Sequence, residues 1–486
     1  MNQPDERPLS FNQASYLVLE WLAHLRARHQ PAVPLRMAIQ LEGALQIDAV
    51  EDALNETVRR HEVLRTSFLD PRRLSAAQEA ALTAGLRRGI ADAGVFTQRV
   101  WSSARVRLAV ETLPGAERED AGAEVRARML QEAERPFDYA APPLMQATLF
   151  RTGPDQHVLL VSLHHLVADS WSMGVIRYEL QALYNRRVTG RSLELPGPAM
   201  QYADFARQQR RQFREIPAAL AAYWKEQWAT YGNAQIKPAD LRAAHLQTAD
   251  PRVTPLSPQD AGHQSVTLDE GIVSSIRALA KRTRATTYMI GLTAMAIVFH
   301  AYTRRTVLAW WGYCSNRRSS EVEGLVGWFA HGRVFGISLT PDETATALIA
   351  RVRDRVYDMY EHEEAPVQVL GNILRDQHIA PPDAFDEHFV SYDFFTEDTS
   401  EVVTLADGVI IRPVPHGWVM TGNWPSLGIW TVESRSALTL RCRYSSTRCA
   451  PSAIAGFLDD FAAIFAALAR TPEASVSQLA AGIAGR

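Results

Sequence analysis

Cysteine is scarce in this chain, and its scarcity argues against two kinds of stabilising site. The 486 residues include three cysteines, Cys314, Cys442 and Cys449, an odd number at scattered positions. This arrangement fits neither a disulfide framework nor a zinc-ligand motif, and it is typical of proteins in a reducing compartment. We therefore expect a cytoplasmic protein without a metal site.

Long hydrophobic runs and an excess of one charge are also lacking. The most apolar stretch, Tyr288–Val298, is too short to cross a bilayer, and the polar start MNQPDERPLS does not resemble a signal peptide. A formal net charge of −3 gives no broad basic surface for nucleic acid. We expect neither a membrane nor a nucleic-acid partner.

The chain is long and apolar enough for more than one large core. Its 486 residues, of which 47% are hydrophobic, predict two domains. The segment Thr189–Pro198 contains two glycines and two prolines and reads as a linker. We therefore assign residues 1–188 to an N-terminal lobe and residues 199–486 to a C-terminal lobe.

Apolar residues at helical spacing predict the main helices of both lobes. These helices are expected at Gln13–Arg28, Asp48–His61, Tyr202–Phe213, Gly271–Arg284, Thr287–Tyr302 and Pro451–Ala469. Asp48 is the expected N-cap of its helix. Arg72–Gly94 has apolar residues at multiples of four and predicts an amphipathic helix, either a surface decoration of the first lobe or a docking element.

The most informative segment is LHHLVADSWSM, from Leu163 to Met173. It follows an apolar run, His157–Leu163, that predicts a strand, and it leads into helical spacing over Ser172–Tyr184. Ser170 or Ser172 is the expected cap of that helix. A strand, a short turn with His165 and Asp169, and a helix can fix an imidazole at a site.

The residues alone leave three interpretations of this segment open. The histidine pair can be hydrogen-bonded core packing. His165 and Asp169, four positions apart, can instead be two metal ligands on one helix face, although that interpretation needs further ligands and a helix in place of the turn. The third interpretation is a catalytic imidazole.

The segment resembles the HHxxxDG motif of condensation domains from nonribosomal peptide synthetases. Other segments are similar to further elements of that family, in the same order. They are LSFNQASY (Leu9–Tyr16), RRHEVLRTSF (Arg59–Phe68), QYADFARQQ (Gln201–Gln209), NRRSSEVEGLVGWF (Asn316–Phe329) and HEEAPVQVL (His362–Leu370). The resemblance extends over almost the whole chain, so the chain is identified as a member of this family.

The resemblance implies an α/β fold of two chloramphenicol-acetyltransferase-like lobes. They would form a V-shaped pseudodimer with an active-site channel between them, and His165 would lie near the middle of that channel. The segment Asn423–Trp430 would cross from the second lobe to the first. Because adenylation and carrier motifs are not visible, we expect a freestanding enzyme, with an excised domain as the alternative.

The activity implied by the resemblance is acyl transfer. An acyl or aminoacyl thioester on the phosphopantetheine of a carrier protein would react with an acceptor amine to form an amide. Carrier proteins are the expected partners of a monomer, a small-molecule acceptor is possible, and no tightly bound cofactor is expected. The alternatives are an ester-forming or acyl-CoA-dependent acyltransferase and a non-catalytic recruitment domain.

The family motif also implies roles for single residues. His165 is the catalytic residue, which removes a proton from the acceptor or positions it. Asp169 supports the site through an ion pair with Arg317, and His164 orients the loop. Ser170 replaces the family's glycine after the aspartate and is expected to alter the fit of substrates.

Three further expectations concern residues outside the histidine motif. His331, in place of an asparagine, is expected to pack rather than to face the acceptor. Arg65 is expected to be structural. The region around the bridge is rich in tryptophan, and most of these side chains are expected in the core. They are Trp310, Trp311, Trp418 and Trp430.

Overall fold

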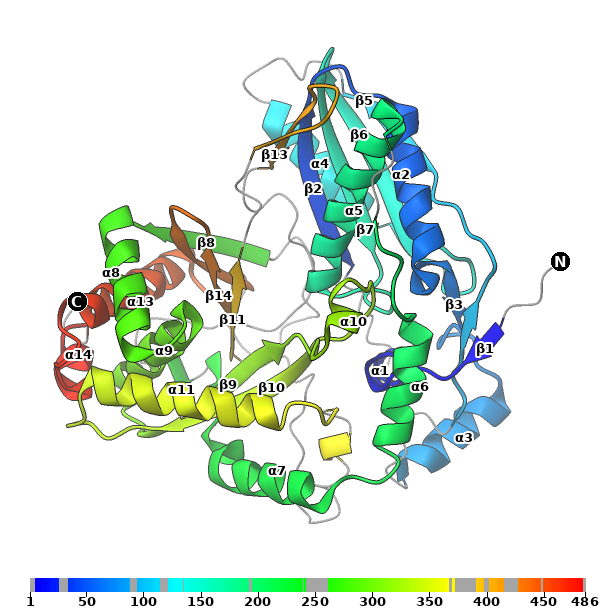
Figure 1. Cartoon of the computed structure of the whole chain (residues 1–486). Coiled ribbons are helices and arrows are strands. Elements are labelled where there is room, and N and C mark those ends of the chain that lie inside the picture. The colour runs from blue at the N-terminus through cyan, green and yellow to red at the C-terminus, as the bar shows by residue number, and fades with distance from the viewer. Residues whose placement is uncertain are drawn as a thin grey trace. The chain divides into compact units, whose positions relative to one another are not determined.

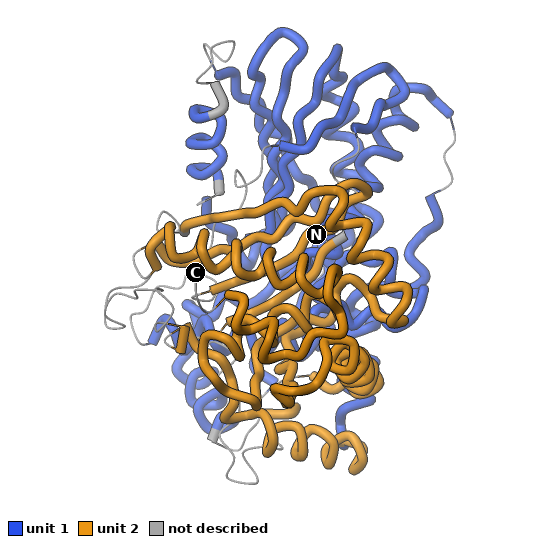
Figure 2. The backbone as a smooth tube through the Cα atoms, turned by 90° about the vertical axis from the view of Figure 1, so that its left-hand side faces the viewer, with its two compact units in different colours: residues 1–215, 315–330, 399–422 blue, residues 216–314, 331–398, 423–486 orange. Residues whose placement is uncertain are grey.

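A computed structural model of the chain describes most of its residues in two compact units. The described residues are 5–25, 34–87, 94–113, 121–133, 135–191, 195–238, 240–241, 261–366, 369–371, 390–396, 402–414, 427–446 and 449–483. Unit 1 comprises residues 1–215, 315–330 and 399–422, and unit 2 comprises residues 216–314, 331–398 and 423–486 (Figure 2). Each unit has its own six-stranded sheet and helices (Figure 1).

The main sheet of unit 1 has the strand order β12-β13-β2-β7-β6-β5. In chain order its strands are β2 (Leu35–Glu42), β5 (Leu108–Thr112), β6 (Met145–Gly153), β7 (Gln156–Leu163), β12 (Val403–Thr404) and β13 (Ile410–Pro413). Only the β5–β6 pairing is parallel among the described strands of this sheet. A smaller sheet joins β1 (Asp5–Arg7), β4 (Gln98–Val100) and β3 (Thr66–Phe68).

The apolar run His157–Leu163 forms strand β7, as predicted, and its residues belong to both core clusters of unit 1. Leu159, Val161 and Leu163 join the large core cluster that includes residues of α2 and α5. Val158 and Leu160 point the other way and join a smaller cluster with residues of α4. Both faces of β7 are therefore buried, which explains why its sequence is apolar throughout rather than alternating.

The helices of unit 1 include those predicted for this part of the chain, near their expected positions, and two that were not predicted, at 121–133 and 320–323. The helices are α1 (Phe11–Leu25), α2 (Ile47–Arg60), α3 (Ala76–Arg87), α4 (Ala121–Ala133), α5 (Ser170–Thr189), α6 (Tyr202–Gln212) and α10 (Ser320–Glu323). The segment 72–94 forms α3, whose Leu82 is buried in the unit 1 core. Its residues 88–93 lie outside the described residues, and the choice between decoration and docking element stays open.

Two expected helix caps are wrong. The N-cap of α2 is Gln46, and Asp48 lies within the first turn. The N-cap of α5 is Asp169, whose side chain accepts from the backbone N–H of Ser172, rather than Ser170 or Ser172. Ser172 instead occupies the third helical position and completes a capping box with Asp169.

Later segments of the chain return to unit 1. Strand β13 pairs with β2 and so extends the sheet, and residues 315–330 belong to the same unit. The units therefore differ from the division at the Thr189–Pro198 linker, which placed residues 199–215, 315–330 and 399–422 in the second lobe. As a statement about separate domains, that division stays a prediction. Within the bridging segment, residues 423–426 lie outside the described residues.

The sheet of unit 2 has the order β10-β9-β11-β14-β15-β8. Its strands are β8 (Ala261–Leu268), β9 (Val307–Cys314), β10 (His331–Ser338), β11 (Val390–Thr396), β14 (Leu427–Glu433) and β15 (Leu438–Ser445). The helices of this unit are α7 (Ala218–Tyr231), α8 (Glu270–Thr283), α9 (Thr287–Thr303), α11 (Ala345–Glu361), α13 (Pro451–Arg470) and α14 (Val476–Ala481).

Helices α9 and α13 form the interior of unit 2. The stretch Tyr288–Val298 lies in α9, which is buried on nearly all sides as its apolar sequence predicted. By length and composition alone α13 could cross a membrane, but its apolar stripe is buried and it packs on α8, α9, β8 and β15. Trp310, Trp311 and Trp430 are buried as expected, and Trp418 lies outside the described residues.

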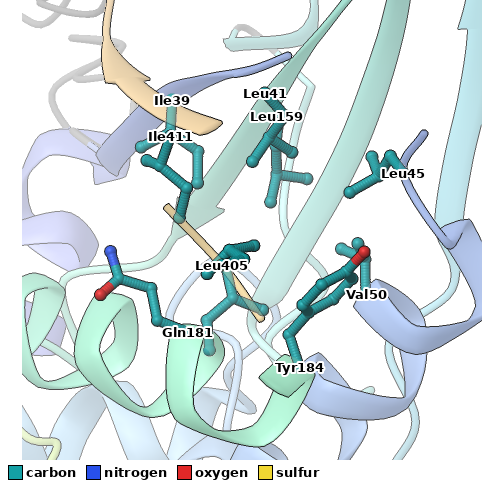
Figure 3. A pocket seen from close by; sticks show the side chains of 10 residues that line it. Ile39, Leu41, Leu45, Val50, Leu159, Gln181, Tyr184, Leu405 and Ile411 are labelled. Atoms are coloured by element: carbon teal, nitrogen blue, oxygen red, sulfur yellow. The ribbon is translucent and has the colours of Figure 1, made fainter. Parts of the chain in front are cut away.

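A small apolar cavity lies in unit 1 between the sheet and the C-terminal half of α5. Figure 3 shows the aliphatic side chains around it, among them Ile39, Leu159, Leu405 and Ile411. The cavity volume of about 20 Å³ has room for about one water molecule. It is far too small for an acyl substrate, and none of its lining residues belongs to the 164–169 turn.

Candidate active site

The histidine motif forms a tight turn between β7, which ends at Leu163, and α5, which begins at Ser170 (Figure 1). The backbone N–H of His164 donates to Leu144 O at 3.0 Å, and the side-chain amide of Gln13 donates to Leu166 O at 2.9 Å. These bonds tie the turn to its surroundings on two sides. The metal interpretation required a helix at this position, and the structure has none there.

His164 is fully buried and holds the inside of the turn. Its Nδ1 accepts a hydrogen bond from the Leu166 backbone N–H at 3.1 Å. The imidazole makes edge contacts with Tyr16, Phe137 and Tyr139, with ring centroids 5.0–5.6 Å apart. Burial, with smaller contributions from His165 and Arg72, lowers its pKa to about 3. A permanently neutral His164 fits the expected role of orienting the loop.

His165 is half-buried and lies against a tryptophan. Its ring centroid is 4.6 Å from that of Trp328, with 41° between the ring planes. Burial lowers the pKa of His165, and the negative charge of Asp169 partly opposes this shift. The imidazole is therefore neutral near pH 7, the form that can accept a proton.

Asp169 is buried with every oxygen occupied. Its Oδ1 accepts from the backbone N–H of Ser172 at 2.9 Å and lies 2.7 Å from the Ser172 hydroxyl. Its Oδ2 accepts from the backbone N–H groups of Phe329 at 3.0 Å and Ala330 at 3.1 Å. Because both of its oxygens already accept hydrogen bonds, this carboxylate has a structural role and is not available as a catalytic base.

Arg317 completes the support of the turn. Its Nη2 donates to Asp169 Oδ1 and to Ser172 Oγ, each at 3.1 Å, and both members of the ion pair have side chains only 1% exposed. Its Nη1 donates to the backbone carbonyls of Val322 and Leu325. The guanidinium also lies 4.1 Å from the ring centroid of Phe329. The ion pair expected from the family resemblance is thus present.

The segment around Trp328 is fixed by residues that sequence reasoning did not assign to the site. Tyr202 OH donates to Trp328 O at 2.7 Å, and Asn12 Nδ2 donates to Trp328 O at 3.2 Å and to Ala330 O at 3.0 Å. The Tyr202 ring packs so closely on Gly327 that a Cβ there would overlap it. Both residues lie in segments that resemble the family, Asn12 in LSFNQASY and Tyr202 in QYADFARQQ, but no local signal assigned either of them to the site.

Asn316, directly before Arg317, has a left-handed backbone conformation. Its φ is 52°. Asparagine is among the few residues with a side chain that tolerate this left-handed conformation. The chain direction that brings Arg317 to Asp169 is therefore kept without glycine.

Other predicted residues lie at the edge of the site or elsewhere. Ser170 is exposed at the start of α5, and it is Ser172 whose hydroxyl contacts Asp169. Arg65 donates to Trp101 O and to Glu62, as expected of a structural residue. His331 is buried in β10 of unit 2, where burial and the Arg333 charge hold its pKa well below the usual range. This buried environment fits the expected packing role of His331.

The chain is similar to parts of two long synthases. Chondramide synthase cmdD of Chondromyces crocatus is 30% identical over 343 residues, which is 70% of this chain and 8% of that protein. Surfactin synthase subunit 1 of Bacillus subtilis (strain 168) is 29% identical over 373 residues, 76% of this chain and 9% of that protein. The chain thus spans less than a tenth of the length of either relative.

Solved structures share the fold at lower identity. The condensation domain of the monacolin K polyketide synthase MokA has a TM-score of 0.75 and 18% identity, covering 98% of this chain and all of that one. The X-domain in complex with OxyB from teicoplanin biosynthesis has a TM-score of 0.71 and 22% identity, covering 99% and 96%. These similarities confirm the predicted α/β class. The Condensation domain family matches residues 4–481, and the chain belongs to that family.

Proposed function

We propose that the chain transfers an acyl or aminoacyl group from a carrier-protein thioester to an acceptor amine, forming an amide bond in nonribosomal peptide biosynthesis. The observation that carries this proposal is the half-buried, neutral imidazole of His165, on a turn whose carboxylate, Asp169, is occupied by structural hydrogen bonds. His165 is therefore the group of the motif that is free to handle a proton. Membership of the condensation-domain family supports the reaction class.

In the proposed reaction, the acceptor nitrogen attacks the thioester carbonyl and forms a C–N bond. The C–S bond then breaks, and the phosphopantetheine thiol leaves with one proton. His165 accepts the proton that the amine loses, or holds the amine in position for attack. The charge of Asp169 favours the imidazolium that forms, because it raises the pKa of His165 against the effect of burial.

The proposed partners are carrier proteins, whose phosphopantetheine arm belongs to the substrate and not to this chain. The proposed acceptor is either carrier-bound or a small amine. We place the reaction in the cytoplasm, where a reducing environment suits three buried cysteines that are all free thiols.

The test is to incubate the protein with a panel of carriers loaded with acyl or aminoacyl groups and a panel of amines, and to detect products by mass spectrometry. An amide that forms with the native protein and with His24→Ala, an exposed histidine on α1, but not with His165→Ala supports the proposal. Products from hydroxyl acceptors or from acyl-CoA would favour the alternative acyltransferases. Stable binding of a partner enzyme without any product would favour recruitment, by analogy with the OxyB complex of the X-domain.

A further inference from the structure

Trp328 makes the closest described ring contact with His165. The centroids lie 4.6 Å apart, and the planes are tilted by 41°, so the imidazole faces the indole at a shallow angle rather than meeting its edge. Trp328 is itself half-buried. The indole therefore covers one side of the imidazole, while both residues remain partly accessible to solvent.

A catalytic histidine is commonly oriented by a hydrogen bond to the ring nitrogen that does not react. In His165 the buried Nδ1 has no hydrogen-bond partner of ordinary geometry within the described residues. Weaker interactions with the backbone of Ala168 and of His165 itself raise the pKa of the ring, against the larger effect of burial. Hydrogen bonding therefore constrains the ring weakly, and packing is left as the main constraint on its orientation.

Trp328 is well suited to supply that constraint because its own position is fixed from several directions. Its carbonyl accepts hydrogen bonds from Tyr202 OH and Asn12 Nδ2. Its ring also makes an edge contact with Tyr16, with centroids 5.7 Å apart.

The next two residues of the chain add a link to the catalytic turn. The backbone N–H groups of Phe329 and Ala330 both donate to Asp169 Oδ2. The aspartate that follows His165 in the turn thus also anchors the segment whose tryptophan covers His165.

We infer that Trp328 is a positioning residue, whose indole orients the His165 imidazole and keeps water from one of its faces. The role of Asp169 is then double, since it holds the turn that carries His165 and the segment that carries Trp328. The inference rests on the proposed function for its catalytic meaning. The geometric part of the inference, that Trp328 orients the His165 imidazole and shields one of its faces, does not depend on any substrate.

The test compares Trp328→Ala, which removes the ring, with Trp328→Phe, which keeps a flat aromatic surface. Both proteins are labelled at their histidines, and the imidazole signals are followed by NMR over a pH titration, with His165→Ala used to assign the His165 signal. The charged groups around His165 are Asp169 and its partner Arg317, and the neighbouring titratable group is His164, which is neutral near pH 7. None of these groups is changed in either variant.

In Trp328→Ala, water reaches the imidazole, so the pKa of His165 should rise toward its ordinary value and its two neutral tautomers should both be populated. In Trp328→Phe, the pKa and the tautomer should remain close to those of the native protein. His164 should be unchanged in both variants, because Leu166, Phe137 and Tyr139 keep their contacts with it when the indole ring is removed. Trp101→Leu, which alters a different tryptophan of unit 1, is the matched control.

An unchanged His165 signal in Trp328→Ala would overturn the inference. A simultaneous change at His164 would also overturn it, because the variant would then have disturbed the whole turn. Where acyl transfer is measurable, kcat should fall about 10- to 100-fold in Trp328→Ala with little change in KM, and Trp328→Phe should restore it. The NMR result needs no turnover, so failure of the proposed activity and failure of this inference are distinguishable.

Discussion

The guanidinium of Arg317 lies 3.1 Å from the carboxylate of Asp169, although 148 positions separate the two residues in the chain. Both side chains are almost completely buried, so water cannot compensate either charge if its partner is lost. The pair joins the turn after β7 to the segment 315–330, and both lie in unit 1. The stability of unit 1 and the shape of the turn therefore depend on the same contact.

Removal of either partner should destabilise the protein strongly. Asp169→Ala and Arg317→Ala should each lower the free energy of unfolding by about 3–5 kcal/mol, because each leaves an uncompensated buried charge. The double variant should lose clearly less than the sum of the two. Chemical denaturation of the four proteins measures this coupling.

The exposed pair Arg187–Asp52, at 2.8 Å on the surface of unit 1, is the control for this cycle. Its coupling energy should be below about 1 kcal/mol, since solvent screens exposed charges. Strictly additive losses for Asp169 and Arg317 would contradict an ion pair between them in solution.

The two neighbouring histidines should have separable roles. His165→Ala should lower product formation at least about 10²-fold while the free energy of unfolding changes little, because the ring is half-buried. His164→Ala should cost about 2 kcal/mol or more of stability, because it leaves a cavity and an unsatisfied Leu166 N–H. Thermal unfolding and the acyl-transfer assay together check this. Near-normal turnover by folded His165→Ala would refute a proton-transfer role.

Much of this site was predictable from the sequence because its parts are local. The apolar run before His164 and the periodic spacing after Ser172 determine β7 and α5, whose bounds differ from the predictions by a few residues. The pairing of Asp169 with Arg317 is not local, and only the family resemblance suggested it.

The remaining features depend on contacts that no local pattern records. Asp169, Ser170 and Ser172 are all polar residues that could cap α5, and the sequence does not distinguish them. In the structure Asp169 is the cap, because its backbone is extended, with ψ near −179°. The bonds from Asn12 and Tyr202 to Trp328 span 316 and 126 positions. Hydrophobic periodicity does not predict such long-range partners. It also does not predict that residues 399–422 belong to unit 1.

The burial of His164 should make the stability of the protein depend on pH. Its folded pKa of about 3 lies below the value of about 6.5 expected in the unfolded chain, so the unfolded chain binds more protons between these values. Stability from this residue is therefore complete above about pH 6.5 and falls as the pH drops toward 3, by up to about 1.4 kcal/mol per pH unit.

His164→Asn tests this dependence, because the asparagine oxygen can still accept from Leu166 N–H but does not titrate. Free energies of unfolding, measured by denaturant titration from about pH 7 downward, should fall less steeply in the variant than in the native protein. Parallel curves for the two proteins would mean that His164 becomes protonated in the folded state as easily as in the unfolded chain.

Gly327 should tolerate no side chain, because the buried ring of Tyr202 occupies the place of its Cβ. In Gly327→Ala, either the ring or the 327–330 segment must move, and Tyr202 OH loses its bond to Trp328 O or to Ser10 Oγ. We expect a loss of about 1–3 kcal/mol in the free energy of unfolding. Gly324→Ala is the matched control, since no atom lies within 4 Å of a Cβ at Gly324 and its φ of −86° suits alanine. Denaturation of both variants decides the matter: equal stability of Gly327→Ala and Gly324→Ala would show that Tyr202 does not pack on this glycine in solution.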